Sequence, residues 1–119
     1  MKDAKLSKIT KVIKALSDES RIRIVNLLKT KNEICVCELT EIINLSQPTI
    51  SSHLKKLHEA EIVDFRKEGL WVNYYLNKEM DIEIEALVNL ISKYIEEDPV
   101  IKQDLLKISS LDRFAICKR

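Results

Sequence analysis

Apolar residues near the start of the chain recur at the three- and four-residue spacing of an amphipathic α-helix. This spacing predicts one helix over residues 4–16 and a second that runs to a polar break at residues 29–33. Ser17 is expected to cap the second helix, because a serine hydroxyl can accept a hydrogen bond from a first-turn N–H. Asp18 would then lie in the first turn, where the helix dipole favours a negative charge.

Two further helical segments follow the break and are joined by a tight connection. The first begins near Val36. The second begins at Ser46 or Gln47, where Pro48 is tolerated because the first-turn N–H has no partner inside the helix. The second segment is apolar along one stripe and carries hydroxyls, a glutamine and lysines on its other faces. Two helices in this arrangement indicate a helix-turn-helix.

The period of the apolar pattern then changes from 3.6 to 2. Residues 62–65 and 71–76 are rich in β-branched and aromatic side chains and predict two strands. Between them lies Gly69, the only glycine of the chain, which can adopt the positive φ that a tight hairpin loop needs. A long helix is predicted from about Asp81 to Glu97, and an amphipathic piece follows it.

The order of these elements predicts a mainly α fold with a β-hairpin wing, that is, a winged helix-turn-helix. Its DNA-binding and dimerisation domain is expected to cover residues 1–98, and residues 99–119 to form a C-terminal helical tail. A chain of 119 residues buries a limited fraction of its surface, so assembly into a homodimer would add stability.

Charge is unevenly distributed along the chain, although the net charge is only +1. Residues 1–60 carry eleven Lys and Arg against seven Asp and Glu, whereas residues 79–119 carry six against nine. A basic N-terminal half is typical of a surface that faces phosphates. An unevenly charged, solvated surface would give the same count.

The sequence offers no sign of a membrane segment or of an enzyme. No apolar run approaches the roughly 20 residues that span a bilayer, and the N-terminus lacks the apolar core of a signal peptide. We therefore expect no membrane partner and a cytoplasmic location, where thiols stay reduced. There is no phosphate-binding loop, carboxylate pair or nucleophile motif, so we expect no catalytic activity.

The polar face of the helix that begins at Ser46 or Gln47 is expected to read double-stranded DNA. Short hydrogen-bonding side chains can pair with base edges, and basic side chains there and in the hairpin can bind phosphates. For His53, a phosphate contact and packing within the domain are both open. The expected DNA-binding residues are Gln47, Thr49, Ser51, Ser52, His53, Lys55, Lys56, Arg66 and Lys67. The alternative is a small helical bundle with a hairpin that binds protein.

Two stretches of the sequence resemble the ArsR/SmtB family of metal-responsive repressors. They are ALSDESRIRIVNLL at residues 15–28 and ICVCELTEIINLSQPTISSHLKKLHEAEIVDFRKEGLWVNYYL at residues 34–76. The resemblance implies a homodimer that binds a palindromic operator and leaves it when an inducer binds. It also implies that the first and last long helices form the dimer contact, for which we expect Leu6, Ile9, Ile13, Leu87, Ile91 and Tyr94.

Cys35 and Cys37 are separated by one residue, at the expected start of a helix. On a regular helix they would point about 200° apart, so they can hold one atom only where the backbone is irregular. The helix N-terminus lowers thiol pKa, and soft thiolates select thiophilic ions. The expected inducer is As(III) or Sb(III), with Cd(II), Pb(II) and zinc as further candidates, and no other cofactor is required.

A trivalent arsenic centre prefers three sulfurs, and the third ligand is not obvious. The resemblance implies that arsenic-sensing members carry this Cys-x-Cys, and some have a third cysteine where this chain has Thr40. Cys117 is the only other thiol and could close the site from either protomer. Three alternatives stay open: a redox or persulfide switch, a cadmium or lead sensor, and cysteines that are small buried hydrophobes.

Overall fold

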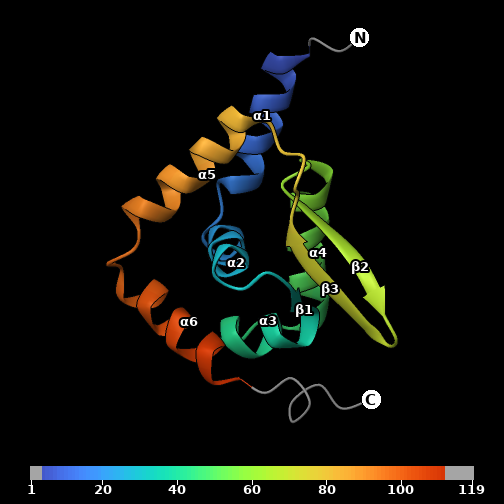
Figure 1. Ribbon diagram of the computed structural model, residues 1–119, viewed down its shortest axis with the longest axis vertical. Coiled ribbons are helices and arrows are strands. Elements are labelled where there is room, and N and C mark those ends of the chain that lie inside the picture. Colours follow the sequence, from blue (N-terminus) through green and yellow to red (C-terminus); the bar gives the residue numbers. More distant parts are fainter. Residues whose placement is uncertain (1–3, 112–119) are drawn as a thin grey trace.

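The computed structural model describes residues 4–111 (Figure 1). Along the chain the elements are α1 Lys5–Leu16, α2 Glu19–Thr30, β1 Ile34–Cys35, α3 Val36–Ile43, α4 Gln47–Glu59, β2 Val63–Glu68, β3 Trp71–Leu76, α5 Ile82–Tyr94 and α6 Pro99–Ser110. The predicted winged helix-turn-helix is confirmed: α3 and α4 are the helix pair, and β2 and β3 form the wing. Among the described residues, no helix combines the length and apolar character needed to cross a lipid bilayer.

The wing belongs to a three-stranded antiparallel sheet with strand order β1-β3-β2. In the hairpin, Phe65 lies opposite Tyr74, and Gly69 closes the loop with φ 61°. The sequence did not predict β1, in which Cys35 lies opposite Asn73 of β3. Strand β1 therefore joins the start of α3 to the wing.

A single apolar core fixes the position of α3 and α4. Side chains from four helices, from two strands and from the residue before β2 are almost completely buried in it: Val12, Ile24, Leu27, Ile34, Leu39, Ile42, Ile50, Leu54, Leu57, Ile62 and Val63. The stripe predicted for the second helix of the pair is thus confirmed, and the opposite side of α4 faces solvent.

The helix ends follow the predicted capping chemistry in α4 but not in α2. The Ser46 hydroxyl accepts a hydrogen bond from the Thr49 N–H at 3.4 Å, as expected for an N-cap. For α2 the expected cap Ser17 was wrong: its hydroxyl donates to the carbonyl of Lys14 at 2.7 Å and closes α1. The cap is Asp18, whose carboxylate accepts the N–H of Arg21 at 3.1 Å.

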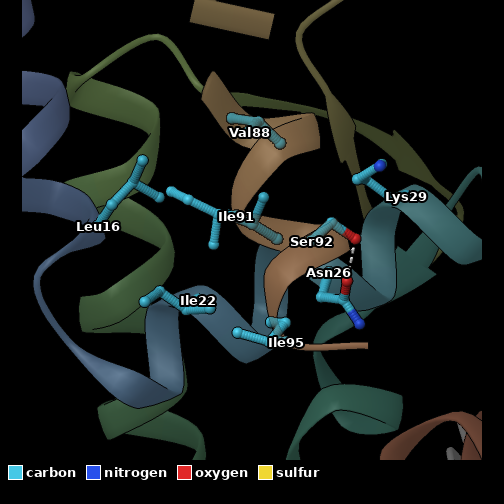
Figure 2. Close-up of a pocket in the computed structure, with 9 residues that line it drawn as sticks. Leu16, Ile22, Asn26, Lys29, Val88, Ile91, Ser92 and Ile95 are labelled. Carbon is cyan, nitrogen blue, oxygen red and sulfur yellow. Dashed lines mark hydrogen bonds between the residues drawn. The ribbon is translucent and has the colours of Figure 1, made fainter. Parts of the chain in front are cut away.

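Helix α5 rests on α1 and α2 (Figure 2). It ends at Tyr94, three residues before the predicted end at Glu97. The Ser92 hydroxyl donates to the side-chain oxygen of Asn26 at 2.5 Å, within an otherwise mainly apolar contact. A cavity of about 10 Å³ remains there, room for one water at most, so it is a packing gap rather than a ligand site.

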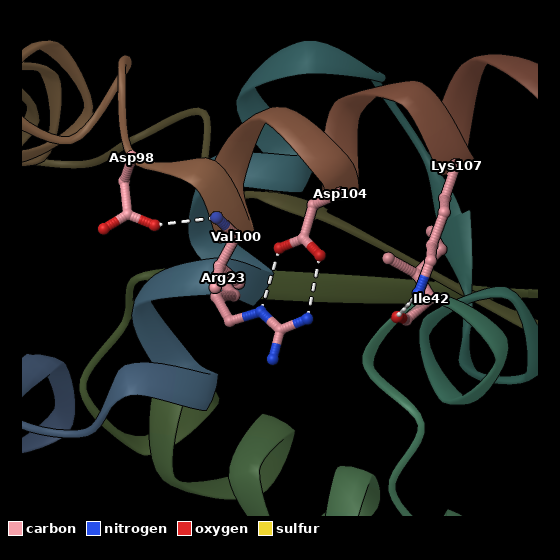
Figure 3. A network of polar contacts seen from close by, with 6 residues as sticks. All are labelled: Arg23, Ile42, Asp98, Val100, Asp104 and Lys107. Carbon is pink, nitrogen blue, oxygen red and sulfur yellow. Dashed lines mark hydrogen bonds and ion pairs between the residues drawn. The ribbon is translucent and has the colours of Figure 1, made fainter.

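The segment after α5 forms α6, which packs against α2 and α3 (Figure 3). The buried carboxylate of Asp104 accepts two hydrogen bonds from the guanidinium of Arg23, at 2.9 and 2.8 Å. This pairing raises the pKa of Arg23 above its ordinary value. The ammonium of Lys107 donates to the carbonyl of Ile42 at 3.3 Å, at the end of α3.

Replacing Asp104 with Ala should lower the free energy of unfolding by roughly 2 kcal/mol, because it removes the charged acceptor of two hydrogen bonds and leaves a partly buried guanidinium unpaired. Urea denaturation followed by circular dichroism measures this change. The matched control is Glu97→Ala, which removes the partner of Lys102 in an exposed pair and should leave the free energy of unfolding nearly unchanged. Equal losses in the two variants would show that α6 is not held by the Arg23–Asp104 contact.

Candidate thiol site and nucleic-acid interface

Cys35 and Cys37 lie on either side of the change from strand to helix. Cys35 ends β1 and is the N-cap of α3, with extended backbone (φ −84°, ψ 161°). The backbone is therefore irregular at the point where the sequence required it to be, and the two Sγ atoms lie 3.1 Å apart. This distance is well beyond the about 2.05 Å of a disulfide bond.

Glu38 holds the junction from the inside. Its carboxylate is completely buried and accepts hydrogen bonds from the N–H of Cys35 at 3.0 Å and from the ammonium of Lys31 at 2.9 Å. The Thr40 hydroxyl donates to the carbonyl of Cys37 at 2.7 Å. Glu38 is not among the site residues expected from the sequence, although an acidic residue three positions after an N-cap has the spacing of a capping box.

The two cysteines differ in their access to solvent. Cys35 is 1% exposed, whereas Cys37 is partly exposed. Cys35 forms a buried cluster with Trp71, the first residue of β3, and Cys37 packs against this cluster. An ion that reaches the site must therefore approach from the side of Cys37.

The sulfur spacing limits which ions the pair can hold without rearrangement. With a metal–sulfur bond of about 2.3 Å, as in zinc thiolates, sulfurs at this distance subtend about 85° at the ion. That angle is smaller than a tetrahedral angle and suits a pyramidal, lone-pair ion such as As(III) better than zinc. Among residues 4–111, no three His, Cys, Asp or Glu side chains gather closely enough to hold a metal ion. Cys117, the expected third ligand, lies outside the described residues.

The structure exposes most of the expected DNA-binding residues of α4. The exposed ones are Gln47, Thr49, Ser51, Ser52, Lys55 and Lys56. His53 is partly buried, and its Nδ1 lies 3.1 Å from Nη1 of Arg21. Because a guanidinium only donates, Nδ1 is the acceptor and the ring proton lies on Nε2. The structure thus places His53 in a contact within the domain.

The two basic residues expected in the wing differ in their surroundings. Lys67 is exposed on β2, and among the described residues its ammonium has no carboxylate within ion-pair distance. Arg66 makes two contacts with the carboxylate of Glu33, at 2.8 and 2.9 Å, and this hydrogen bonding raises the pKa of the guanidinium. Glu33 precedes Cys35 by two residues, so Arg66 links the wing to the thiol segment.

The residues expected at a dimer contact fall into two groups. Leu6, Ile13 and Tyr94 are highly exposed, whereas Ile9, Leu87 and Ile91 are half-buried against the core. The ammonium of Lys8 lies 3.0 Å from the carboxylate of Asp81 and brings the start of α1 beside the start of α5. A surface recess of about 770 Å³ lies there, lined in part by the exposed apolar side chains of Leu6 and Ile82.

Comparison with known proteins identifies relatives of this arrangement. The family model described as "Bacterial regulatory protein, arsR family" matches residues 18–64. The arsenic resistance transcriptional regulator ArsR1 of Pseudomonas putida is 44% identical over 77 residues, which cover 65% of this chain and 60% of that protein. The cadmium resistance transcriptional regulatory protein CadC of Lactococcus lactis is 39% identical over 84 residues, which cover 71% of this chain and 68% of that protein.

A solved structure supports the same assignment of the fold. It is the homodimeric winged helix-turn-helix DNA-binding domain of Mb0332 from Mycobacterium bovis, a possible ArsR-family transcriptional regulator. The two chains superpose with a TM-score of 0.68 at 27% sequence identity, over 81% of this chain and 85% of that one.

The Glu38–Lys31 pair should set the reactivity of the thiols, with opposite effects of its two charges. In the reduced protein, Glu38→Gln should move the alkylation profile of Cys37 to lower pH, because it removes a negative charge that opposes the thiolate. Lys31→Met, the matched variant, should move the profile to higher pH. The rate of alkylation by iodoacetamide as a function of pH measures both shifts. Shifts in the same direction would contradict an electrostatic role for the pair.

Proposed function

The chain belongs to the arsR family of bacterial regulatory proteins, and we propose that it is a repressor that leaves its operator DNA when arsenite or antimonite binds Cys35 and Cys37. The family consists of transcriptional regulators, so the prediction that the protein is not an enzyme is confirmed. The observation that carries the proposal is the pair of sulfurs 3.1 Å apart at the start of α3, the helix that precedes the DNA-reading helix.

DNA binding would use α4 as the reading helix. Its N-terminal half presents short polar side chains of a size that can reach base edges in the major groove. A homodimer would place two such helices on a palindromic site, because a two-fold interface matches a two-fold operator. The exposed apolar side chains of α1 and α5 support the first and last long helices as the dimer contact.

Release would follow from the links between the thiols and the DNA-binding elements. Helix α3 packs directly on α4, and β1 pairs with β3 through Cys35 and Asn73. An ion bound between the sulfurs would sit against Trp71 and shift the base of the wing. The ligand needs only to prefer the arrangement that does not bind DNA: a coupling of about 1–3 kcal/mol lowers DNA affinity roughly 5–150-fold.

Two other inducers are supported by particular observations. The CadC relative, a cadmium resistance regulator, supports cadmium as a candidate ion. The short distance between the sulfurs favours a redox-sensing repressor as the second function, because a movement of about 1 Å would bring them to disulfide bond length. Either thiol chemistry would require a reducing compartment such as the cytoplasm for its resting state.

Replacing both Cys35 and Cys37 with Ser should leave DNA binding intact and abolish release by arsenite. Fluorescence anisotropy of a labelled duplex, selected for binding from a random-sequence pool, measures both properties, and a parallel titration with peroxide separates ion sensing from oxidation. The Cys117→Ser variant tests the third ligand: a weaker response to arsenite supports it, and an unchanged response removes Cys117 from the site. Release of the double variant by arsenite would place the sensing site elsewhere.

Trp71 should report ion binding directly, because it is the only tryptophan of the chain and forms a buried cluster with Cys35, against which Cys37 packs. Addition of arsenite to the reduced protein should change its fluorescence intensity or emission maximum, and the Cys35→Ser/Cys37→Ser variant should show no change. If arsenite releases DNA while the emission of Trp71 stays constant, the signal does not pass through the base of the wing.

A further inference from the structure

We propose that Lys11 and Lys14 of α1, together with Lys56 of α4, form a second phosphate-binding site that holds the DNA backbone on the side of α4 away from the wing. The proposal rests on the DNA binding proposed above. It extends the DNA contact to α1, which belongs neither to the helix pair α3 and α4 nor to the wing. None of the DNA-binding residues expected from the sequence lies on α1.

The site is a surface recess of about 290 Å³ between α1, α2 and α4. It is lined by Lys11, Lys14, Ala15, Arg21, Lys56 and Glu59. Four of these side chains are cationic and one is anionic, so the lining carries a net charge of about +3 at neutral pH. This local excess is larger than the +1 of the whole chain.

Arg21 supports the floor of the recess. It is buried, its Nε donates to the carbonyl of Ala15 at 2.6 Å, and its Nη1 donates to the ring of His53. These two hydrogen bonds tie the end of α1 and the middle of α4 to α2. The lysines on α1 and α4 are therefore held at a fixed separation by the fold rather than by contact with each other.

The three lysines are available for an external anion. In the part of the chain that the structure describes, the ammonium groups of Lys11, Lys14 and Lys56 have no carboxylate within ion-pair distance, unlike Lys8, which is paired with Asp81. Glu59 lines the same recess but makes no ion pair with them. All three lysines are exposed to solvent.

The recess and the wing lie on opposite flanks of α4. Lys56 shares a helix face with His53, which contacts α2. His58 lies about 200° away around the helix axis, and its ring lies 5.2 Å from Phe65 of the wing. The exposed Ser52 and Lys55 lie between these flanks.

This arrangement matches the shape of duplex DNA. A helix in the major groove, which is about 12 Å wide, has one phosphate backbone on each side. The wing can reach one backbone, and the lysines of the recess are placed to meet the other. Because the recess is open and its cations are solvated, it suits a phosphate presented on a large surface better than a small enclosed anion.

The test compares two double variants that each remove two exposed lysines. Lys11→Ala/Lys14→Ala removes the two lysines on the α1 side of the recess. Lys29→Ala/Lys78→Ala, the control, removes the same charge at a different cleft, which is lined by residues of α2, β3 and α5. Binding to a duplex selected from a random-sequence pool is measured by anisotropy over a range of salt concentrations. Circular dichroism checks that both variants keep their helices.

The α1 variant should bind about tenfold more weakly near physiological salt, and its salt slope should fall by roughly 0.9 for each phosphate that the protein no longer neutralises. The control should change neither by more than twofold. Equal effects in the two variants, or an unchanged slope in the α1 variant, would overturn the site. Failure of the wild-type protein to bind any duplex would instead overturn the proposed function.

A free anion is distinguished by two further measurements. Inorganic phosphate at matched ionic strength should not displace the wild-type protein from DNA more than chloride does, since DNA is the proposed ligand. Selective displacement by phosphate that disappears in the α1 variant would assign the recess to a free oxyanion and overturn the DNA assignment. If the wild-type protein protects backbone phosphates beside the bases that α4 contacts and the α1 variant does not, the assignment of the recess to DNA is supported.

Discussion

The change from strand to helix at Cys35 is the constraint on which the thiol site depends. If α3 continued as a regular helix through both cysteines, their side chains would point away from each other. Because Cys35 has extended backbone and Cys37 is already helical, the sulfurs converge to 3.1 Å. Glu38 stabilises this conformation by accepting the N–H of Cys35. A buried carboxylate is tolerable only when paired, and Lys31 supplies the partner.

Cys35 also belongs to the sheet, because it is the last residue of β1 and pairs with Asn73 of β3. The thiol site and the wing therefore share one piece of backbone. A strand of two residues would be weak alone, but β1 is reinforced by the Glu33–Arg66 contact on one side and by Trp71 on the other. Only two residue pairs join β1 to β3, so the end of the strand at Cys35 can shift more easily than the core helices. In the function that we propose, this shared backbone would let an ion at the sulfurs act on the wing without contacting DNA.

The sequence predicted best those features that one residue type enforces locally. Ser46 and Pro48 fixed the start of α4, and Gly69 marked the loop of the wing. Other features depend on contacts between distant segments. A two-residue strand has no period to detect, and the contact of Cys35 with Trp71 joins residues 36 positions apart.

For α2, Ser17 and Asp18 could both accept a first-turn N–H, and only the backbone conformation decides between them. The sequence placed the thiols at an irregular helix start, but it could not show which one is buried.

The distribution of charge around α4 explains why net charge is a poor guide to DNA binding here. The acidic excess of residues 79–119 offsets most of the basic excess of the N-terminal half in the total, but screening limits its influence on a phosphate at α4 to about 10 Å. On the wing side, Glu33 already neutralises part of the positive charge of Arg66. On the α1 side, the ammonium groups of Lys11 and Lys14 keep their full charge for phosphate. A change at the thiols that moves Glu33 would thus alter the electrostatics of the wing and leave the α1 side intact. Release of the operator would then begin on the flank of α4 nearest the sulfurs.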